Sequence, residues 1–108
     1  MNGEGVEEDE EKAVYHLEKA AIGGNPFARF NLACIEERNG NADRAAKHFI
    51  IAANLGDEDS MKALREFYSD GNITKEDFDA TLRKHQSAID EMKSPERDEA
   101  YAYFYTDS

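Results

Sequence analysis

The chain repeats itself, and this internal repeat limits the folds open to it more than any other feature. The stretch HLEKAAIGGNPFARFNL begins at His16, and HFIIAANLGDEDSMKAL begins 32 residues later at His48. Identical pairs at this offset are Ala13/Ala45, His16/His48, Ala20/Ala52, Ala21/Ala53, Gly24/Gly56 and Leu32/Leu64. A period between about 20 and 50 residues is typical of solenoids, in which each unit buries its apolar face only against a neighbour.

Apolar spacing and stop signals divide the chain into short helices. Glycine and asparagine punctuate it at Gly23-Gly24, Asn39-Gly40, Gly56 and Gly71-Asn72, as expected at helix ends. Apolar residues recur at three- and four-residue steps between these points, which predicts helices over about 9–22, 26–38, 42–54, 61–68 and 75–92. Asn25, Asn41 and Thr74 are the predicted N-caps. Because the connections are short, neighbouring helices should be antiparallel.

The predicted fold is all-α, a short right-handed α-solenoid of two helix hairpins and a C-terminal capping helix. We expect a lead-in over 1–8, hairpin units over 9–40 and 41–72, a capping helix over 73–93 and an acidic, aromatic tail over 94–108. The capping helix should pack through a single stripe of Phe78, Leu82, Ile89 and Met92. The tail should be ordered in part at most, and Ser94-Pro95 is interpreted as a helix stop rather than a phosphorylation site.

Composition excludes several classes of function. With 24 acidic and 13 basic residues among 108, the net charge of −11 would repel a phosphate backbone, so we expect no nucleic acid partner. No apolar run approaches the roughly 20 residues that a bilayer requires, and the N-terminus is acidic rather than signal-like. The single cysteine, Cys34, cannot form an internal disulfide. We therefore expect a cytoplasmic or other reducing intracellular location and no membrane insertion.

The repeated residues resemble the Sel1-like repeat, a helix-hairpin relative of the tetratricopeptide repeat. The first unit carries Gly5-Val6, Ala13, Ala20-Ala21, Gly24, Ala28 and Leu32, and the second carries Arg44-Ala45, Ala52-Ala53, Gly56, Ser60, Leu64, Tyr68 and Gly71. His16-Leu17 and His48-Phe49 stand where the family often has Trp-Tyr. Asn2-Gly3-Glu4-Gly5 is similar to the end of a preceding repeat, which favours an array that begins further upstream. The resemblance implies a scaffold that organises other proteins rather than a catalyst.

Three residues are candidates for a metal site or a nucleophile: His16, His48 and Cys34. Zinc usually requires three or four ligands in a closed geometry, and Cys34 belongs to a different predicted helix from either histidine. The apolar flanks of Cys34 favour a buried structural thiol over a nucleophile. The sequence contains no phosphate-binding loop and no distinctive pair of catalytic carboxylates. We therefore predict no enzymatic activity, no cofactor and no metal.

The remaining candidates are partner-binding residues. Tyr15, Lys19, Lys47 and Asn54 lie off the alanine-rich packing stripe, on the side that a solenoid presents as its concave surface. Lys19 and Lys47 would favour an acidic or carboxylate-bearing peptide. Merely solvated side chains are the alternative at these positions. Three alternative functions stay open for the whole chain: a structural end piece of a longer array, a self-associating unit, or a regulatory subunit of an enzyme complex.

Overall fold

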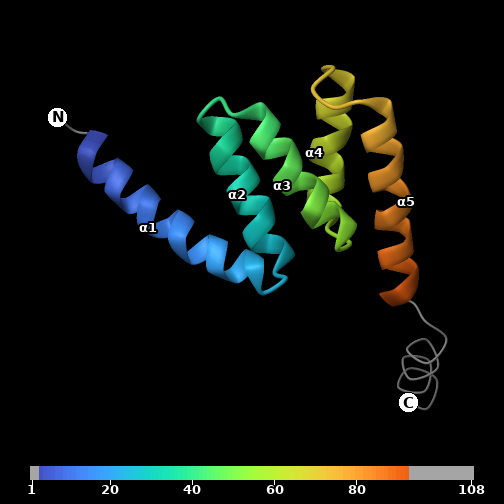
Figure 1. Ribbon diagram of the computed structural model, residues 1–108, viewed down its shortest axis with the longest axis horizontal. Coiled ribbons are helices and arrows are strands. Elements are labelled where there is room, and N and C mark those ends of the chain that lie inside the picture. Colours follow the sequence, from blue (N-terminus) through green and yellow to red (C-terminus); the bar gives the residue numbers. More distant parts are fainter. Residues whose placement is uncertain (1–2, 93–108) are drawn as a thin grey trace, which may run out of the picture.

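The computed structural model describes the backbone of residues 3–92 and the side chains of residues 8–92, and all regular structure in this part is helical (Figure 1). The helices are α1 (Gly3–Ile22), α2 (Pro26–Arg38), α3 (Ala42–Asn54), α4 (Glu58–Ser69) and α5 (Lys75–Met92). Consecutive helices are joined by short turns and pack against one another. The predicted all-α solenoid is confirmed. The predicted tail, with Ser94-Pro95, lies outside the described residues.

Helix starts follow the predicted capping residues at two of three positions. The side-chain oxygen of Asn25 accepts hydrogen bonds from the backbone N–H groups of Phe27 and Ala28, at 2.9 and 3.2 Å. The Thr74 hydroxyl accepts one from the Asp77 N–H at 3.1 Å. Asn41 holds the position before α3, but its side chain makes no capping hydrogen bond. Its φ of −99° and ψ of 67° depart from the extended conformation that directs a capping side chain to the first turn.

The start of α1 differs from the prediction of about residue 9, because the helix already begins at Gly3. The extension carries a run of carboxylates in the sequence EGVEEDEE. Negative charge near a helix N-terminus is stabilised by the helix dipole, and no proline interrupts the segment. Most of the predicted lead-in over residues 1–8 is therefore helical.

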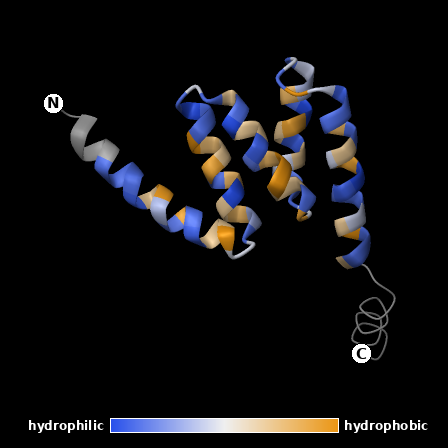
Figure 2. Cartoon of the chain, in the orientation of Figure 1, coloured by the Kyte–Doolittle hydropathy of each residue, from blue (hydrophilic) through white to orange (hydrophobic). Residues whose placement is uncertain are grey.

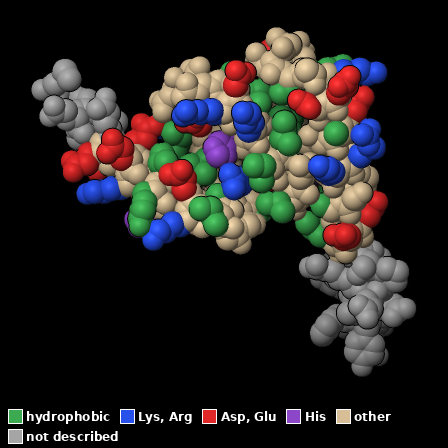
Figure 3. Space-filling model, in the orientation of Figure 1, with side chains coloured by type: hydrophobic (Ala, Val, Ile, Leu, Met, Phe, Trp, Pro, Cys, Tyr) green, Lys and Arg blue, Asp and Glu red, His purple; other side chains and the backbone are tan. Residues whose placement is uncertain are grey.

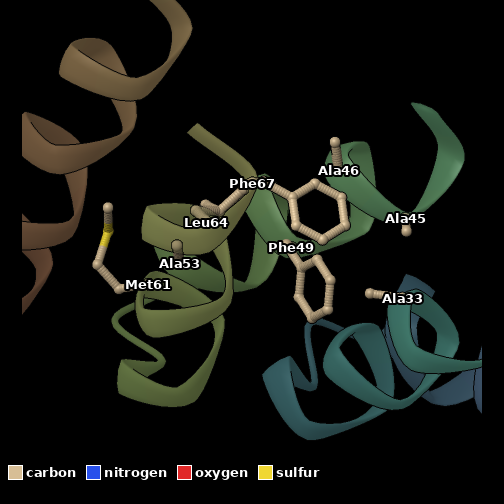
Figure 4. Packing of buried hydrophobic residues seen from close by; sticks show 8 residues of the cluster. All are labelled: Ala33, Ala45, Ala46, Phe49, Ala53, Met61, Leu64 and Phe67. Atoms are coloured by element: carbon tan, nitrogen blue, oxygen red, sulfur yellow. The ribbon is translucent and has the colours of Figure 1, made fainter. Parts of the chain in front are cut away.

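The main core lies where α3 packs against α2 and α4 (Figure 4). Phe49 is 1% exposed, and its ring centroid lies 5.6 Å from that of Phe30 on α2 and 5.4 Å from that of Phe67 on α4. Small residues surround these rings, and Ala33, Ala45 and Ala53 are fully buried. Small side chains let the helices approach closely, which explains why alanine recurs at the repeated positions. Every helix also carries hydrophilic residues (Figure 2).

A smaller cluster attaches α1 to α2. Ala21 of α1 and Ala28 and Leu32 of α2 are buried, with Val14, Leu17 and Ala20 packed around them. Towards the other end of α2, Asn39 donates a hydrogen bond to the Glu10 carboxylate at 2.9 Å. Figure 1 shows α1 leaving the other helices at an angle. Among the described residues, the apolar attachment of α1 is therefore this small cluster with α2.

The capping helix α5 packs against α3 and α4 through a buried polar residue, His85, that sequence analysis did not predict. His85 is 4% exposed; its Nδ1 lies 2.8 Å from the Ala53 carbonyl oxygen, and its Nε2 lies 3.2 Å from the Glu58 carboxylate. The predicted packing stripe is wrong in part, since Leu82 is 37% exposed, while Met92 is 46% exposed but its side chain still reaches the turn at Gly56. Thr81 and His85 are the buried residues of α5. Both are satisfied by hydrogen bonds, since the Thr81 hydroxyl donates to the Asp77 carbonyl at 2.8 Å and the His85 ring bonds groups of α3 and α4.

Gly56 permits a close approach of α5 to the turn after α3. Its φ of +101° lies in the left-handed region, where side chains are strained. A Cβ atom there would also lie 2.7 Å from the Cε atom of Met92. The second of the two repeated glycines therefore has a packing role as well as a turn role.

Shortening the side chain to alanine should destabilise the fold more at Phe49 than at its repeat counterpart Leu17. Phe49→Ala should lower the free energy of unfolding by about 3–5 kcal/mol, since it empties a fully buried ring site. Leu17→Ala should lower it by only about 1–2 kcal/mol, because Leu17 is half-buried. Urea titration followed by circular dichroism measures both. Equal losses would contradict the uneven burial of the two units.

The packing of α5 against α3 and α4 should depend on His85. His85→Ala should cost about 1–3 kcal/mol of unfolding free energy, because it empties a buried site and removes the hydrogen bonds of the ring to Glu58 and to the Ala53 carbonyl, which keeps the Gly56 N–H as its other partner. Hydrogen exchange should accelerate in α5 more than in α2. Gln86→Ala, at an exposed neighbouring position, is the control and should change the unfolding free energy by less than about 0.5 kcal/mol. Unchanged exchange in α5 would show that the histidine does not hold the helix.

Candidate partner-binding surface

Tyr15 and Lys19 are brought together one helical turn apart on α1. The Lys19 ammonium lies 4.7 Å from the centroid of the Tyr15 ring, a cation–π contact. The His16 ring meets Tyr15 edge-on at 5.5 Å. Tyr15 is 55% exposed, so its ring remains accessible beside the lysine. These two predicted residues form one exposed group.

The surface around Tyr15 is acidic rather than basic. A hollow of about 490 Å³ on α1 is lined by Glu10, Glu11, Val14, Tyr15 and Glu18. Figure 3 shows acidic side chains gathered over the N-terminal part of α1, whereas basic side chains and a histidine occupy the middle of the same face. The sequence missed this hollow, whose carboxylates lie on the same side of the helix as Tyr15.

Lys47 and Asn54 lie on a different surface, the groove between α3 and α5, which we call the α3–α5 seam. A hollow of about 260 Å³ at one end is lined by Asp43, Ala46, Lys47, Ile50, Asn72, Ile73, Thr74 and Asp77. A hollow of about 330 Å³ at the other end is lined by Asn54, Arg83, Lys84, Ser87, Ala88 and Glu91. Among residues 8–92, no hydrogen bond or ion pair joins this seam to Tyr15 or Lys19.

The second hollow contains functional candidates that sequence reasoning missed. The Asn54 side-chain oxygen is buried and lacks a hydrogen-bond partner within the described part of the chain. Arg83 and Lys84 are exposed beside it, and neither has an ion-pair partner among the described residues. The parallel course of α3 and α5 that brings these residues together arises only in the packed structure. Each helix shows an ordinary polar face in sequence.

His48 belongs to the packing between α2 and α3. Its Nδ1 lies 3.3 Å from a guanidinium nitrogen of Arg29, which can only donate, so Nδ1 accepts. Burial and then the charge of Arg29 lower the pKa of His48 below its ordinary value of 6.5, while Glu36 and Glu18 oppose that shift. Glu36 also lies 3.7 Å from Arg44 of α3. His48 thus contributes to a polar contact between helices.

The residues weighed as chemical sites are not brought together. His16 is exposed on α1, and Cys34 is half-buried on α2 against the main core. Burial, together with Glu37, raises the pKa of the Cys34 thiol, while Arg38 opposes this shift. The described residues contain no group of three histidine, cysteine or acidic side chains arranged to hold a metal ion. Within the same residues, no helix is both long and apolar enough to span a bilayer.

Comparison with known families gives one match. A family model described as Sel1 repeat matches residues 1–25 and 26–57, more than half of the chain. The second segment contains α2 and α3, the most extensively packed pair of helices. These segments divide the chain at other points than the predicted units 9–40 and 41–72, whose boundaries stay a prediction. No curated protein and no solved structure matches the chain.

The contact between Arg29 and His48 should make stability depend on pH. Because the pKa of His48 is lowered in the folded state, the unfolded chain takes up the proton first as pH falls through about 6.5. The free energy of unfolding should therefore decrease between about pH 7 and pH 5, and His48→Gln should make this decrease shallower. Urea titrations across this range measure both slopes. Identical slopes would show that His48 titrates alike in both states.

Proposed function

The chain belongs to the Sel1 repeat family, whose members are generally protein–protein interaction modules, and from this membership we propose that it is a non-catalytic scaffold or adaptor. It binds a protein or peptide partner on the concave face formed by its first helices, α1 and α3. The family is typically non-catalytic, and this proposal assigns no reacting group. The observation that carries it is the buried oxygen of Asn54, which has no hydrogen-bond partner among the described residues, beside Arg83 and Lys84, which have no ion-pair partner among the same residues.

The α3–α5 seam is the principal contact of this proposal. An unpaired buried acceptor is costly, and a partner that supplies an N–H donor to Asn54 would recover part of that cost. Arg83 and Lys84 stand next to it and would attract a carboxylate. Lys47 lies at the opposite end of the seam, where Asp43 and Asp77 balance its charge. An acidic peptide would therefore place its carboxylates towards Arg83 and Lys84.

Tyr15 and Lys19 have a secondary role in this proposal. Their contact keeps the ammonium over the ring, so a partner meets a tyrosine edge and a cation together. Tyrosine contributes contact area at little cost in conformational entropy, which favours it at interfaces. A segment that crosses from the α3–α5 seam to α1 would then use all four predicted residues, Tyr15, Lys19, Lys47 and Asn54.

Selection from a displayed peptide library against the full chain tests this function. The enriched peptides should contain Asp or Glu, and their affinity should fall at least about tenfold for the variant Arg83→Glu, Lys84→Glu, because two attractive charges become repulsive. The variant Tyr15→Ala, Lys19→Glu should weaken binding by a smaller factor. Fluorescence anisotropy measures each affinity.

The matched control is Lys62→Glu, Arg65→Glu, which makes the same change of charge on exposed residues of α4. It should leave the affinity within about twofold, since distant exposed charges are screened by salt. Circular dichroism verifies that every variant is folded. An equal loss in the control and seam variants would show that net charge, rather than the α3–α5 seam, selects the peptide.

A further inference from the structure

The end of α5 lies at the same end of the α3–α5 seam as Asn54. The side chain of Met92, the last residue of α5, reaches the turn at Gly56, two residues after Asn54. Glu91 lines the hollow at this end of the seam. The sequence then continues into the acidic, aromatic tail over 94–108, which lies outside the described residues. The tail is therefore attached to the chain at the mouth of this hollow.

The hollow offers three polar groups to an incoming segment. The side-chain oxygen of Asn54 is buried and has no hydrogen-bond partner among the described residues. Arg83 and Lys84 are exposed and have no ion-pair partner in the same part of the chain. An extended segment would supply a backbone N–H donor to Asn54, and its carboxylates would pair with the two cations. The chemistry of the hollow therefore fits an extended, acidic segment.

The first part of the tail has this composition and the required reach. The tail begins with SPERDE, in which three of six residues are acidic and one is basic. Pro95 disfavours helix at the residue before it, so the chain can change direction after α5. A helix rises about 12 Å over the eight residues from Lys84 to Met92, and four extended residues span about 13 Å. After a turn over 93–95, residues 96–99 would reach back to Lys84.

The order of residue types along the tail also matches the order along the seam. Beyond Asn54, towards the starts of α3 and α5, the seam is lined in part by the half-buried Ile50 and Ile73. In the tail, the acidic residues are followed by the aromatic sequence YAYFY over 101–105. The helices α3 and α5 run in the same direction (Figure 1). A segment that turns back at the end of α5 would therefore meet the cations first and the isoleucines afterwards.

We propose that the tail folds back into the α3–α5 seam and occupies it until a partner displaces it. Its carboxylates pair with Arg83 and Lys84, and one of its backbone N–H groups bonds to Asn54. Its aromatic rings cover Ile50 and Ile73, which removes apolar surface from water. The tail is thus an autoinhibitory segment. Its inhibitory role rests on the proposed function, whereas the contact itself needs no partner and can be measured without one.

Tethering makes a weak contact sufficient for this role. A short tether holds a segment at an effective concentration on the order of millimolar. A tail that would bind with a Kd of about 1 mM as a separate peptide would then occupy the seam in most molecules. A competing peptide binds only to the open fraction, so its apparent affinity falls in proportion. Release of the tail should therefore raise the affinity for an acidic peptide about three- to tenfold.

Paramagnetic relaxation enhancement in the full chain tests the contact in the absence of a partner. Ala100→Cys carries a nitroxide label in a chain with Cys34→Ser, and the amide signals of the ¹⁵N-labelled protein are compared before and after reduction of the nitroxide. The signals of Ile50, Asn54 and Arg83 should be broadened. Signals of α1 should keep their intensity, because α1 packs against α2 and lies away from the seam (Figure 1).

A charge exchange tests the pairing of the tail with the two cations. The tail-reversed chain replaces the first three acids of the tail by lysine: Glu96→Lys, Asp98→Lys and Glu99→Lys. This chain should lose most of the broadening, and so should the variant Arg83→Glu, Lys84→Glu. The two sets combined should restore it, because each pair is then reversed in sign. The variant Lys62→Glu, Arg65→Glu on α4 is the control and should leave the broadening unchanged. Circular dichroism verifies that each variant is folded.

The peptides selected for the proposed function test the inhibitory role. They should bind the tail-reversed chain about three- to tenfold more tightly, as measured by fluorescence anisotropy. A matched control makes the same change of net charge on exposed residues of three other helices: Glu8→Lys, Glu37→Lys and Glu66→Lys. This control should change the affinity by less than about twofold, since distant exposed charges are screened by salt.

Three outcomes would overturn the tail contact. The first is the absence of broadening in the seam, and the second is broadening that persists in the tail-reversed chain. The third is broadening seen only when labelled ¹⁴N chain is mixed with unlabelled ¹⁵N chain, which would make a second copy the occupant. If acidic peptides still bind in any of these cases, the proposed function stands alone. Seam broadening without any enriched acidic peptide would support the tail contact and contradict the proposed function.

Discussion

The packing of small residues around Phe49 is the contact on which the rest of the structure depends. Within residues 3–92, α3 is the helix that packs extensively against three others, and it can do so because alanines line its sides. A bulkier stripe would hold the neighbouring helices apart and leave Phe49 without the rings of Phe30 and Phe67. The arrangement of α2, α4 and α5 is therefore set by the side chains of one helix.

The same repeat pattern produces different surfaces in the two units because their neighbours differ. On α3, the side towards α5 becomes the α3–α5 seam, with Lys47 and Asn54 at its ends. On α1, the corresponding residues Glu11, Tyr15 and Glu18 line an open acidic hollow. A repeat thus fixes where surfaces form, whereas substitution at the exposed positions fixes what they attract. The net charge of −11 hides this local contrast.

Much of the fold could be predicted because its signals are local. The ends of α2 and α3, the Asn25 cap and the alanine stripe all follow from residues a few positions apart. The start of α1 at Gly3 was harder to predict, because Gly3 and Gly5 are typical of a helix end, whereas the carboxylates that follow favour a helix start. His85 was missed because its partners, Ala53 and Glu58, lie about 30 residues away in sequence. Arg83 and Lys84 were missed for the same reason, since only packing places them beside Asn54.

The uneven attachment of the helices has a mechanical consequence. A solenoid transmits force from one helix to the next, since each unit contacts only its neighbours. Tension applied at the N-terminal end would meet the small apolar cluster between α1 and α2 first, and this cluster has three buried residues. The eight buried residues around α3 would resist longer. Under load α1 would therefore peel away before the centre yields, so the chain would lengthen in steps rather than rupture at once.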